Sequence, residues 1–176
     1  FASPNLDDHA ETLGIKGRAL AVAGDFAGGL ACADAACEED PANVYNFLNR
    51  ADIYWMQGDR LAAIGSATQG IAVDERNATA RLMRAMLYDE EGDHANALAD
   101  YRAFYDLAPK AAERIPDEYL KEIDADAYDK VVKARADAEK AAAEARKKEK
   151  EENTAGTSKD TKENTGKDGT KAKTVL

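Results

Sequence analysis

The hydrophobic and polar positions of residues 44–77 form two amphipathic helical patterns, joined by a short polar turn at Gly58 and Asp59. Apolar residues recur every three or four positions on each side of the turn, as they do on one face of an α-helix. The same order of residues recurs 34 positions earlier and 34 positions later. The pattern therefore predicts three helix–turn–helix units, 10–43, 44–77 and 78–111.

Each unit turns at a glycine followed by an aspartate. The three pairs are Gly24 with Asp25, Gly58 with Asp59, and Gly92 with Asp93. Glycine tolerates the positive φ that is common just past a helix end, and aspartate can accept hydrogen bonds from the free amides of the next helix. Asn43 and Asn77 end the first two units, where asparagine suits the cap of the helix that follows.

Small residues recur at two positions of each unit. They are Gly17, Ala51 and Ala85 at the eighth position, and Gly29, Ala63 and Ala97 at the twentieth. Side chains of this size allow two helices to approach to the roughly 8–10 Å between axes that is typical of packed helices. We therefore expect the two helices of each unit to meet at these positions.

The repeat pattern is lost after residue 111. Residues 112–132 are predicted to form a capping helical segment, because the last repeat of an array needs an amphipathic cover. Residues 133–152 have high helix propensity but little to bury, which predicts a charged helix exposed to solvent. The Lys-, Thr- and Gly-rich residues 153–176 are expected to be a disordered tail, and residues 1–9 a flexible lead-in.

Residues 10–111 resemble the tetratricopeptide repeat (TPR). The resemblance rests on an aromatic residue or leucine at the fourth position of a unit, a small residue at the eighth, tyrosine or leucine at the eleventh, the Gly-Asp pair, alanine at the twentieth and proline at the thirty-second. Arg81, Glu75 and Phe104 depart from the pattern, and Phe104, in the last unit, is expected to face a cap. The resemblance implies an all-α fold, a right-handed α-solenoid whose concave wall is lined by the first helix of each unit.

The TPR resemblance also implies which positions face the concave groove, namely the second, fifth, ninth, twelfth and thirteenth of each unit. The central unit supplies Trp55, the only tryptophan, together with other aromatic and thioether side chains that are frequent at the centres of interfaces. The predicted partner-binding residues are Arg18, Tyr45, Leu48, Asn49, Asp52, Trp55, Met56, Leu82, Met86, Asp89 and Glu90. The acidic members of this set suggest a protein or peptide ligand with basic residues around an apolar anchor.

The best-known TPR specificity grips the C-terminal carboxylate of heat-shock chaperones with a clamp of two lysines, two asparagines and one arginine. The corresponding positions are Gly14, Arg18, Asn49, Thr79 and Met83, and only Asn49 agrees with the clamp. A threonine and a methionine cannot hold an anionic terminus by charge. The resemblance therefore predicts a ligand of a different kind.

The net charge of −10 is unevenly distributed. Residues 1–125 carry 11 Lys and Arg against 23 Asp and Glu, and an acidic surface of this kind disfavours nucleic acid as a partner. No apolar run approaches the roughly 20 residues of a membrane span, and no signal-peptide pattern opens the chain. The chain begins at Phe1 without an initiator methionine, so we leave an exported, an organellar and a cytoplasmic location all open.

Candidate catalytic and metal-ligating residues are sparse. His9 and His94 are 85 residues apart, and no nucleotide-binding, hydrolase or metalloprotease motif occurs, so we expect no enzyme and no cofactor. Cys32 and Cys37 lie five positions apart without a Cys/His cluster. We interpret them as small apolar residues of a packing face, with a disulfide or metal role as the alternative, and we expect no metal site.

The pattern as a whole predicts a protein–protein interaction module, an adaptor or an assembly subunit that binds a peptide or protein segment in the groove. The alternative is a structural or self-associating subunit, with a homo-oligomer as one form. In that case the groove is filled by a second copy or by the chain's own C-terminal segment.

Overall fold

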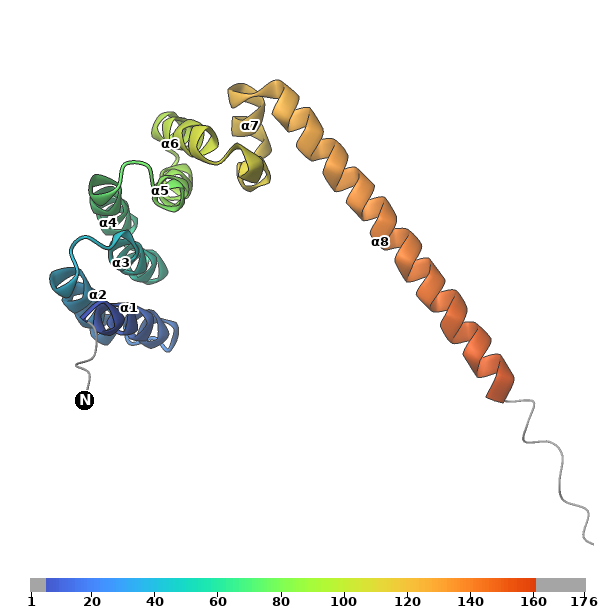
Figure 1. The fold of residues 1–176 in the computed structure, drawn as a ribbon, viewed down its shortest axis with the longest axis horizontal. Coiled ribbons are helices and arrows are strands. Elements are labelled where there is room, and N and C mark those ends of the chain that lie inside the picture. The colour runs from blue at the N-terminus through green and yellow to red at the C-terminus, as the bar shows by residue number, and fades with distance from the viewer. Residues whose placement is uncertain (1–5, 161–176) are drawn as a thin grey trace, which may run out of the picture. The chain divides into compact units, whose positions relative to one another are not determined.

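Helices make up most of the part of the chain that the computed structural model describes, which is residues 6–160 for the backbone and 9–150 for side-chain burial. The first six helices form three consecutive pairs: α1 (Leu6–Val22) with α2 (Phe26–Glu39), α3 (Val44–Gln57) with α4 (Arg60–Val73), and α5 (Ala78–Glu90) with α6 (His94–Leu107). The 3-10 helix η1 (Pro109–Arg114), α7 (Asp117–Ile123) and α8 (Ala125–Asp160) follow (Figure 1). No strand occurs within residues 6–160, and the predicted all-α fold of three helix pairs is confirmed.

The chain divides into two compact units, Phe1–Tyr128 and Asp129–Leu176. The first unit contains the three helix pairs, η1, α7 and the first residues of α8. Within the described residues, the second unit consists of the remainder of α8, and its side chains are exposed from 132 to 150. The segment that we predicted as a charged helix, 133–152, lies within this part of α8.

Two boundaries differ from the prediction. α1 begins at Leu6, inside the flexible lead-in predicted for 1–9, and the His9 ring nitrogen Nδ1 lies 2.7 Å from a Glu39 carboxylate oxygen at the end of α2. α8 continues to Asp160, so residues 153–160 are helical where we expected a disordered tail. A helix that already exists gains one hydrogen bond for each residue added, without a new nucleation cost, so weak helix formers can extend it. The rest of the predicted tail, 161–176, lies outside the described residues, as do residues 1–5.

The turns of the three pairs have the predicted chemistry. Gly24, Gly58 and Gly92 have φ values of 90°, 88° and 77°, a region that favours glycine. The aspartates that follow them accept hydrogen bonds from amides in the first turn of α2, α4 and α6, at 2.9, 3.0 and 3.2 Å. Asn43 and Asn77 accept equivalent bonds, each of 3.0 Å, at the starts of α3 and α5. The sequence pattern therefore set the helix boundaries by local capping.

The predicted contact of small residues is also confirmed. The alanines at the eighth and twentieth positions of the second and third units are fully buried. In the first unit both positions are glycine, and the helices come closer still. A Cβ atom added to Gly17 would lie 2.7 Å from the carbonyl oxygen of Gly29, and one added to Gly29 would lie 2.8 Å from that of Gly17. α1 and α2 therefore meet backbone against backbone.

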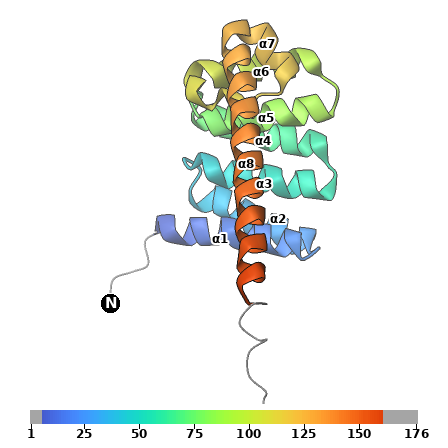
Figure 2. The ribbon, with the colours of Figure 1, turned by 90° about the vertical axis from the view of Figure 1, so that its right-hand side faces the viewer.

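The helices of the three pairs form two layers. α1, α3 and α5 lie in one layer and α2, α4 and α6 in the other (Figure 1), and Figure 2 shows the pairs stacked in chain order. α3 packs on α1 and contacts α5, and α2 and α4 each pack against the first helix of the next pair. Each pair is therefore joined to the preceding pair through its own first helix, α3 or α5.

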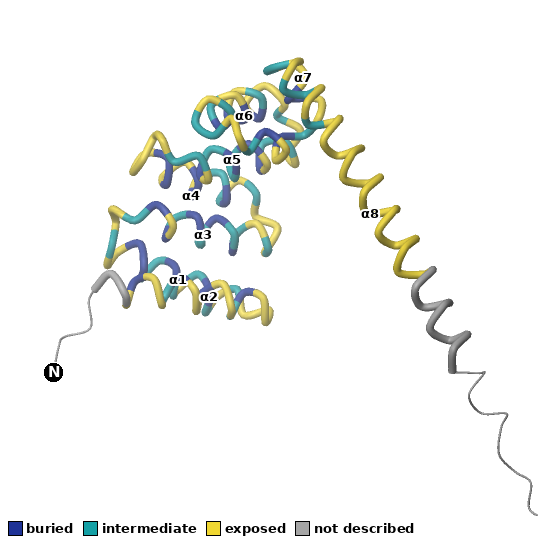
Figure 3. The backbone as a smooth tube through the Cα atoms, turned by 45° about the vertical axis from the view of Figure 1, so that its right-hand side comes forward, coloured by how far each residue is buried: buried dark blue, intermediate teal, exposed yellow. Residues whose placement is uncertain are grey.

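The core follows the contacts between neighbouring helices rather than filling one centre. Ile53 of α3 packs against Ala21 and Ala33 of the first pair. Leu48 of α3 packs in a cluster with Ala80 of α5. Figure 3 shows buried positions along all six helices of the three pairs, as expected for an array in which each repeat contacts only its neighbours.

A recurring arginine connects successive pairs. Arg50 of α3 donates a hydrogen bond from Nη1 to Asp34 of the preceding pair at 2.9 Å. Its Nε donates to the Ser66 hydroxyl of its own pair at 3.3 Å. Arg84 stands 34 residues after Arg50 in the sequence and makes the equivalent contacts one unit later.

In the third pair the arginine contacts include a buried carboxylate. Arg84 donates to the Thr68 hydroxyl of the preceding pair at 3.1 Å, and its Nε lies 2.6 Å from an oxygen of Asp100. Asp100 is only 3% exposed and also accepts from Nη1 of Arg81 at 3.1 Å. A buried carboxylate is costly unless it is paired, and Arg81, which departs from the apolar residue of the repeat pattern, gives Asp100 a second cation beside Arg84.

The segment after α6 covers the end of the repeat array. Ile115, Tyr119 and Leu120 are buried, and the rings of Tyr119 and Tyr101 lie 4.8 Å apart between centroids. Phe104 is buried as well, and the Arg114 guanidinium of η1 lies 5.8 Å from its ring centroid. The large residue at this position therefore faces the capping segment, as predicted.

Both cysteines are free thiols. Cys37 is buried in α2, and burial raises the pKa of its thiol. Among residues 6–160, no helix is long and apolar enough to cross a membrane.

Candidate functional site

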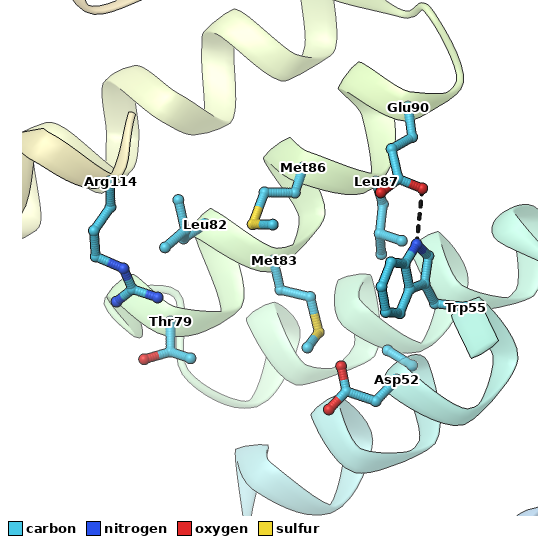
Figure 4. Close-up of a pocket in the computed structure, with 10 residues that line it drawn as sticks. Asp52, Trp55, Thr79, Leu82, Met83, Met86, Leu87, Glu90 and Arg114 are labelled. Carbon is cyan, nitrogen blue, oxygen red and sulfur yellow. Dashed lines mark hydrogen bonds between the residues drawn. The ribbon is translucent and has the colours of Figure 1, made fainter. Parts of the chain in front are cut away.

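The site with the clearest shape is a pocket of about 170 Å³, formed mainly by side chains of α3 and α5 (Figure 4). The residues that line it, which we call the Trp55 pocket, are Ala51, Asp52, Trp55, Thr79, Leu82, Met83, Met86, Leu87, Glu90 and Arg114. Its volume is below the roughly 300–1,000 Å³ of sites for small molecules. It is suited to a single apolar side chain.

The Trp55 pocket combines a fixed floor with exposed walls. Leu82 and Leu87 are buried, and Met83 packs against the core clusters on both sides of it. Trp55 and Met86 remain 46% and 51% exposed, although both are large apolar side chains. Exposed aromatic and thioether groups above a packed apolar floor are typical of a contact surface for another molecule.

The Trp55 indole is held in place by a carboxylate. Its Nε1 donates a hydrogen bond of 2.7 Å to Glu90. Nε of Arg60 donates to the same oxygen at 3.2 Å and lies 3.5 Å from Glu91. The predicted residues Trp55 and Glu90 are therefore hydrogen-bonded to each other. Arg60, which the sequence analysis missed, binds the same carboxylate.

A second carboxylate, Asp52, lies at the pocket next to α1. Nε of Arg18 lies 3.2 Å from Asp52 Oδ2. Burial raises the pKa of the Asp52 carboxyl, and the charge of Arg18 opposes this shift. The structure thus brings together these two predicted residues as an ion pair.

Asp89, a predicted groove residue, does not line the Trp55 pocket and is hydrogen-bonded to α7. The Tyr119 hydroxyl of α7 donates to it at 2.5 Å, and the His94 ring nitrogen lies 2.8 Å from the same hydroxyl. Burial and the bond to Asp89 raise the pKa of Tyr119. The capping segment therefore occupies this part of the predicted surface.

Four other predicted residues lie outside the pocket. Leu48 is buried in the core, and Met56 is half-buried against the core cluster of the first two pairs. Asn49 faces Gly14, where an added Cβ would lie 2.6 Å from the asparagine amide nitrogen. Tyr45 is exposed, but it lies beside the loops between pairs. Of these four, Leu48 is the most deeply buried, with 3% of its surface exposed.

The fifth position of every unit is in fact buried. It holds Gly14, Leu48 and Leu82 in the three units, and Leu82 reaches the pocket only as part of its floor. This position faces the neighbouring pair because successive first helices pack against each other. At this position Gly14 and Leu48 are buried, and Leu82 alone of the three borders the pocket.

Thr79, Met83 and Arg114 are pocket residues that were not in the predicted set. Thr79 stands at the second position of its unit, which the TPR resemblance places in the groove, and Met83 at a position that was considered only for a chaperone clamp. Arg114 lies beyond the repeats, so the repeat pattern gave no reason to expect it at the pocket. Among the described residues, no group of three or more His, Cys, Asp and Glu side chains could hold a metal ion.

Comparison with solved structures identifies the architecture. The first TPR of Spaghetti (RPAP3), bound to the HSP90 peptide SRMEEVD, is similar with a TM-score of 0.56 and 21% identity, over 74% of this chain and 98% of that chain. The Arabidopsis OM64 TPR domain has a TM-score of 0.54 and 20% identity, over 74% and 99%. This chain has the tetratricopeptide-repeat fold.

A third similar structure is the Yersinia enterocolitica type III secretion chaperone SycD in complex with a peptide of the translocator YopD. Its TM-score is 0.57 and its identity 19%, over 66% of this chain and 92% of that chain. No family model matches the sequence, and no curated protein matches it either. At these identities the similarity extends to the TPR fold alone.

The TPR fold gives the five clamp positions a definite environment here. Gly14 is buried beside Asn49, Arg18 is paired with Asp52, and Thr79 and Met83 line the Trp55 pocket. The one cation of the set is thus already engaged by a carboxylate. In place of a basic clamp, this TPR array presents an apolar pocket with two acidic residues.

Proposed function

We propose that the chain is a protein-interaction module that binds a peptide or protein segment through its TPR array. An apolar side chain of the partner enters the Trp55 pocket. The observation that carries the proposal is the exposure of Trp55 and Met86 directly above a packed apolar floor. Burying such side chains at the centre of an interface is a main source of binding energy.

Two further observations support binding of a segment in place of catalysis. The pocket is too small for most small-molecule substrates but wide enough for a side chain. The similar structures of RPAP3 and SycD each contain a peptide. We therefore propose an adaptor or an assembly subunit.

The test uses a displayed library of random peptides, selected on the full chain. Peptides that bind the wild type should lose at least tenfold in affinity for the double variant Trp55→Ala, Met86→Ala, because truncation at an interface centre commonly costs more than about 1.4 kcal/mol. Leu61→Ala is the control, since Leu61 is 76% exposed on α4 and does not line the Trp55 pocket. Trp55 fluorescence reports binding to the wild type and to Leu61→Ala, and anisotropy of a labelled peptide measures the double variant, which lacks this tryptophan. Peptides that bind the double variant as tightly as the wild type would disprove the proposed site.

A second candidate function is self-association, and the capping segment favours it. Tyr119 already covers Asp89, and Arg114 borders the pocket, so residues of this chain can lie on this surface. Sedimentation over a range of concentrations, combined with quenching of Trp55, separates the two functions. A monomer with quenchable Trp55 supports an open binding site, whereas an oligomer that protects Trp55 supports self-association.

A further inference from the structure

The charges around the Trp55 pocket are arranged on opposite sides. Figure 4 shows Trp55, Asp52 and Glu90 on one side and Arg114 with Thr79 on the other. The leucine and methionine side chains lie between the two sides. A ligand that enters this pocket therefore meets two carboxylates next to its apolar anchor.

Each of these carboxylates is held by an arginine from a neighbouring helix. Arg60 lies 3.2 Å from Glu90, and Arg18 lies 3.2 Å from Asp52. Both arginines are largely exposed, with 41% and 55% of their side chains accessible. Exposed ion pairs of this kind contribute little to stability, so a competing cation can replace one partner easily.

Glu90 is the better placed of the two for such an exchange. Its bond from the Trp55 indole, at 2.7 Å, is independent of Arg60 and keeps the carboxylate in position if Arg60 leaves. A second depression, lined by Trp55, Met56, Arg60 and Glu90, shares two residues with the Trp55 pocket. It offers room for the aliphatic stem of a long basic side chain beside the indole face, where a cation is also attracted to the ring.

We propose that the partner segment carries a lysine or arginine next to its apolar anchor, and that this cation replaces Arg60 at Glu90. Arg60 is then a specificity-determining residue. In the free chain Arg60 forms an ion pair with Glu90, and it therefore competes with the partner's cation for that carboxylate. The inference rests on the proposed function, and the excess of acidic residues in 1–125 acts in the same direction by attracting a basic partner.

The test starts from the tightest-binding peptide of the library selection. One version carries lysine beside the anchor and a second carries glutamine at the same place, and fluorescence anisotropy measures both. The wild type should prefer the lysine version. Arg60→Ala should strengthen binding of the lysine version by about two- to fivefold, the range for release of one exposed ion pair, and leave the glutamine version unchanged.

Two more variants complete the design. Glu90→Gln should abolish the preference for lysine while it keeps an acceptor for the Trp55 indole. Arg102→Ala removes the same charge from an exposed position of α6 outside the pocket, and should leave both affinities unchanged. The preference of the wild type for lysine should fall as salt concentration rises.

The outcomes separate this inference from the proposed function. Equal binding of the two versions by the wild type would overturn the exchange at Glu90 while the pocket itself stands. An effect of Arg102→Ala as large as that of Arg60→Ala would overturn it too, because net charge alone would then explain the preference. If no peptide is selected through the Trp55 pocket, the proposed function fails first and the inference fails with it.

Discussion

Glycine at the contact between α1 and α2 leads to a prediction in which two effects oppose each other. Gly17→Ala should destabilise the chain, although alanine is the better helix former. The same substitution at Gly65, in the middle of α4, should stabilise it. The two sites differ in their surroundings, because an added Cβ at Gly65 meets nothing within 4 Å, whereas at Gly17 it would lie 2.7 Å from the Gly29 carbonyl oxygen.

The magnitudes decide the sign of each change. Replacing glycine by alanine inside a helix gains about 0.5–1 kcal/mol from backbone entropy and helix propensity. Forcing an extra carbon into a packed contact costs about 1–3 kcal/mol, and the neighbouring atom belongs to the backbone, which cannot rotate away as a side chain can. We therefore expect Gly65→Ala to stabilise by up to about 1 kcal/mol. Gly17→Ala should destabilise by about 1–2 kcal/mol.

Urea denaturation followed by circular dichroism at 222 nm measures both variants. The midpoint should rise for Gly65→Ala and fall for Gly17→Ala, with no change in slope if the unfolded state is unaffected. The glycine pair itself provides a further check, because Gly29→Ala should resemble Gly17→Ala. A gain of stability in Gly17→Ala would refute the close backbone contact.

Three other predictions concern stability. Asp100→Asn should cost about 3 kcal/mol, because it leaves two arginines without their buried counter-charge; Asp34→Asn, at a half-exposed carboxylate, should cost less than about 1 kcal/mol in the same urea titration. Asp59→Ala removes the cap of α4 and should cost about 1 kcal/mol, read from the thermal midpoint; an unchanged midpoint would contradict the capping role. Burial raises the pKa of Tyr101 to about 12, so the stability that this residue confers should be complete below about pH 10 and lost as the pH rises toward 12. Tyr101→Phe should flatten that decline, and an identical pH profile in wild type and variant would count against it.

The local features of the fold were predictable because each depends on a few neighbouring residues. A glycine and an aspartate at a fixed spacing specify a turn and a cap, and small residues at two positions specify a close helix contact. These signals recur in every unit, so chance matches at single positions are averaged out. The exposure of Trp55 and Met86 follows from the same helical phase.

The site was predicted less completely, since a helical phase gives the direction of a side chain but not what lies beyond it. Leu48 of α3 packs against Ile71 of its own pair and Ala80 of the next, and only this packing decides that its direction is buried. The Asp89 carboxylate accepts a hydrogen bond from Tyr119, which lies 30 residues further along the chain in a segment without the repeat pattern. Arg114 reaches the pocket from the same region.

One signal for the connection between pairs was present in the sequence and was missed. Arg50 and Arg84 stand at the same position of two units, and each has polar partners 16 residues before and 16 residues after it. Only the structure shows that these spacings bring the groups together. The departure at Arg81 was noticed, but its counterpart Asp100 was not connected with it.

Because the arginine contacts are spaced symmetrically, removal of one whole unit would bring an arginine and a carboxylate together at the new junction. If residues 44–77 were excised, Arg84 would follow Asp34 at the distance at which Arg50 now follows it. The shortened chain would present the Asp34 carboxylate to Arg84 at the new junction. A duplicated 44–77 would instead place the copied Arg50 16 residues after Thr68, so that junction would offer a hydroxyl in place of a carboxylate. Loss or gain of the central repeat would therefore leave the arginine at the changed junction with a polar partner on the preceding pair, a carboxylate in the shorter array and a hydroxyl in the longer one.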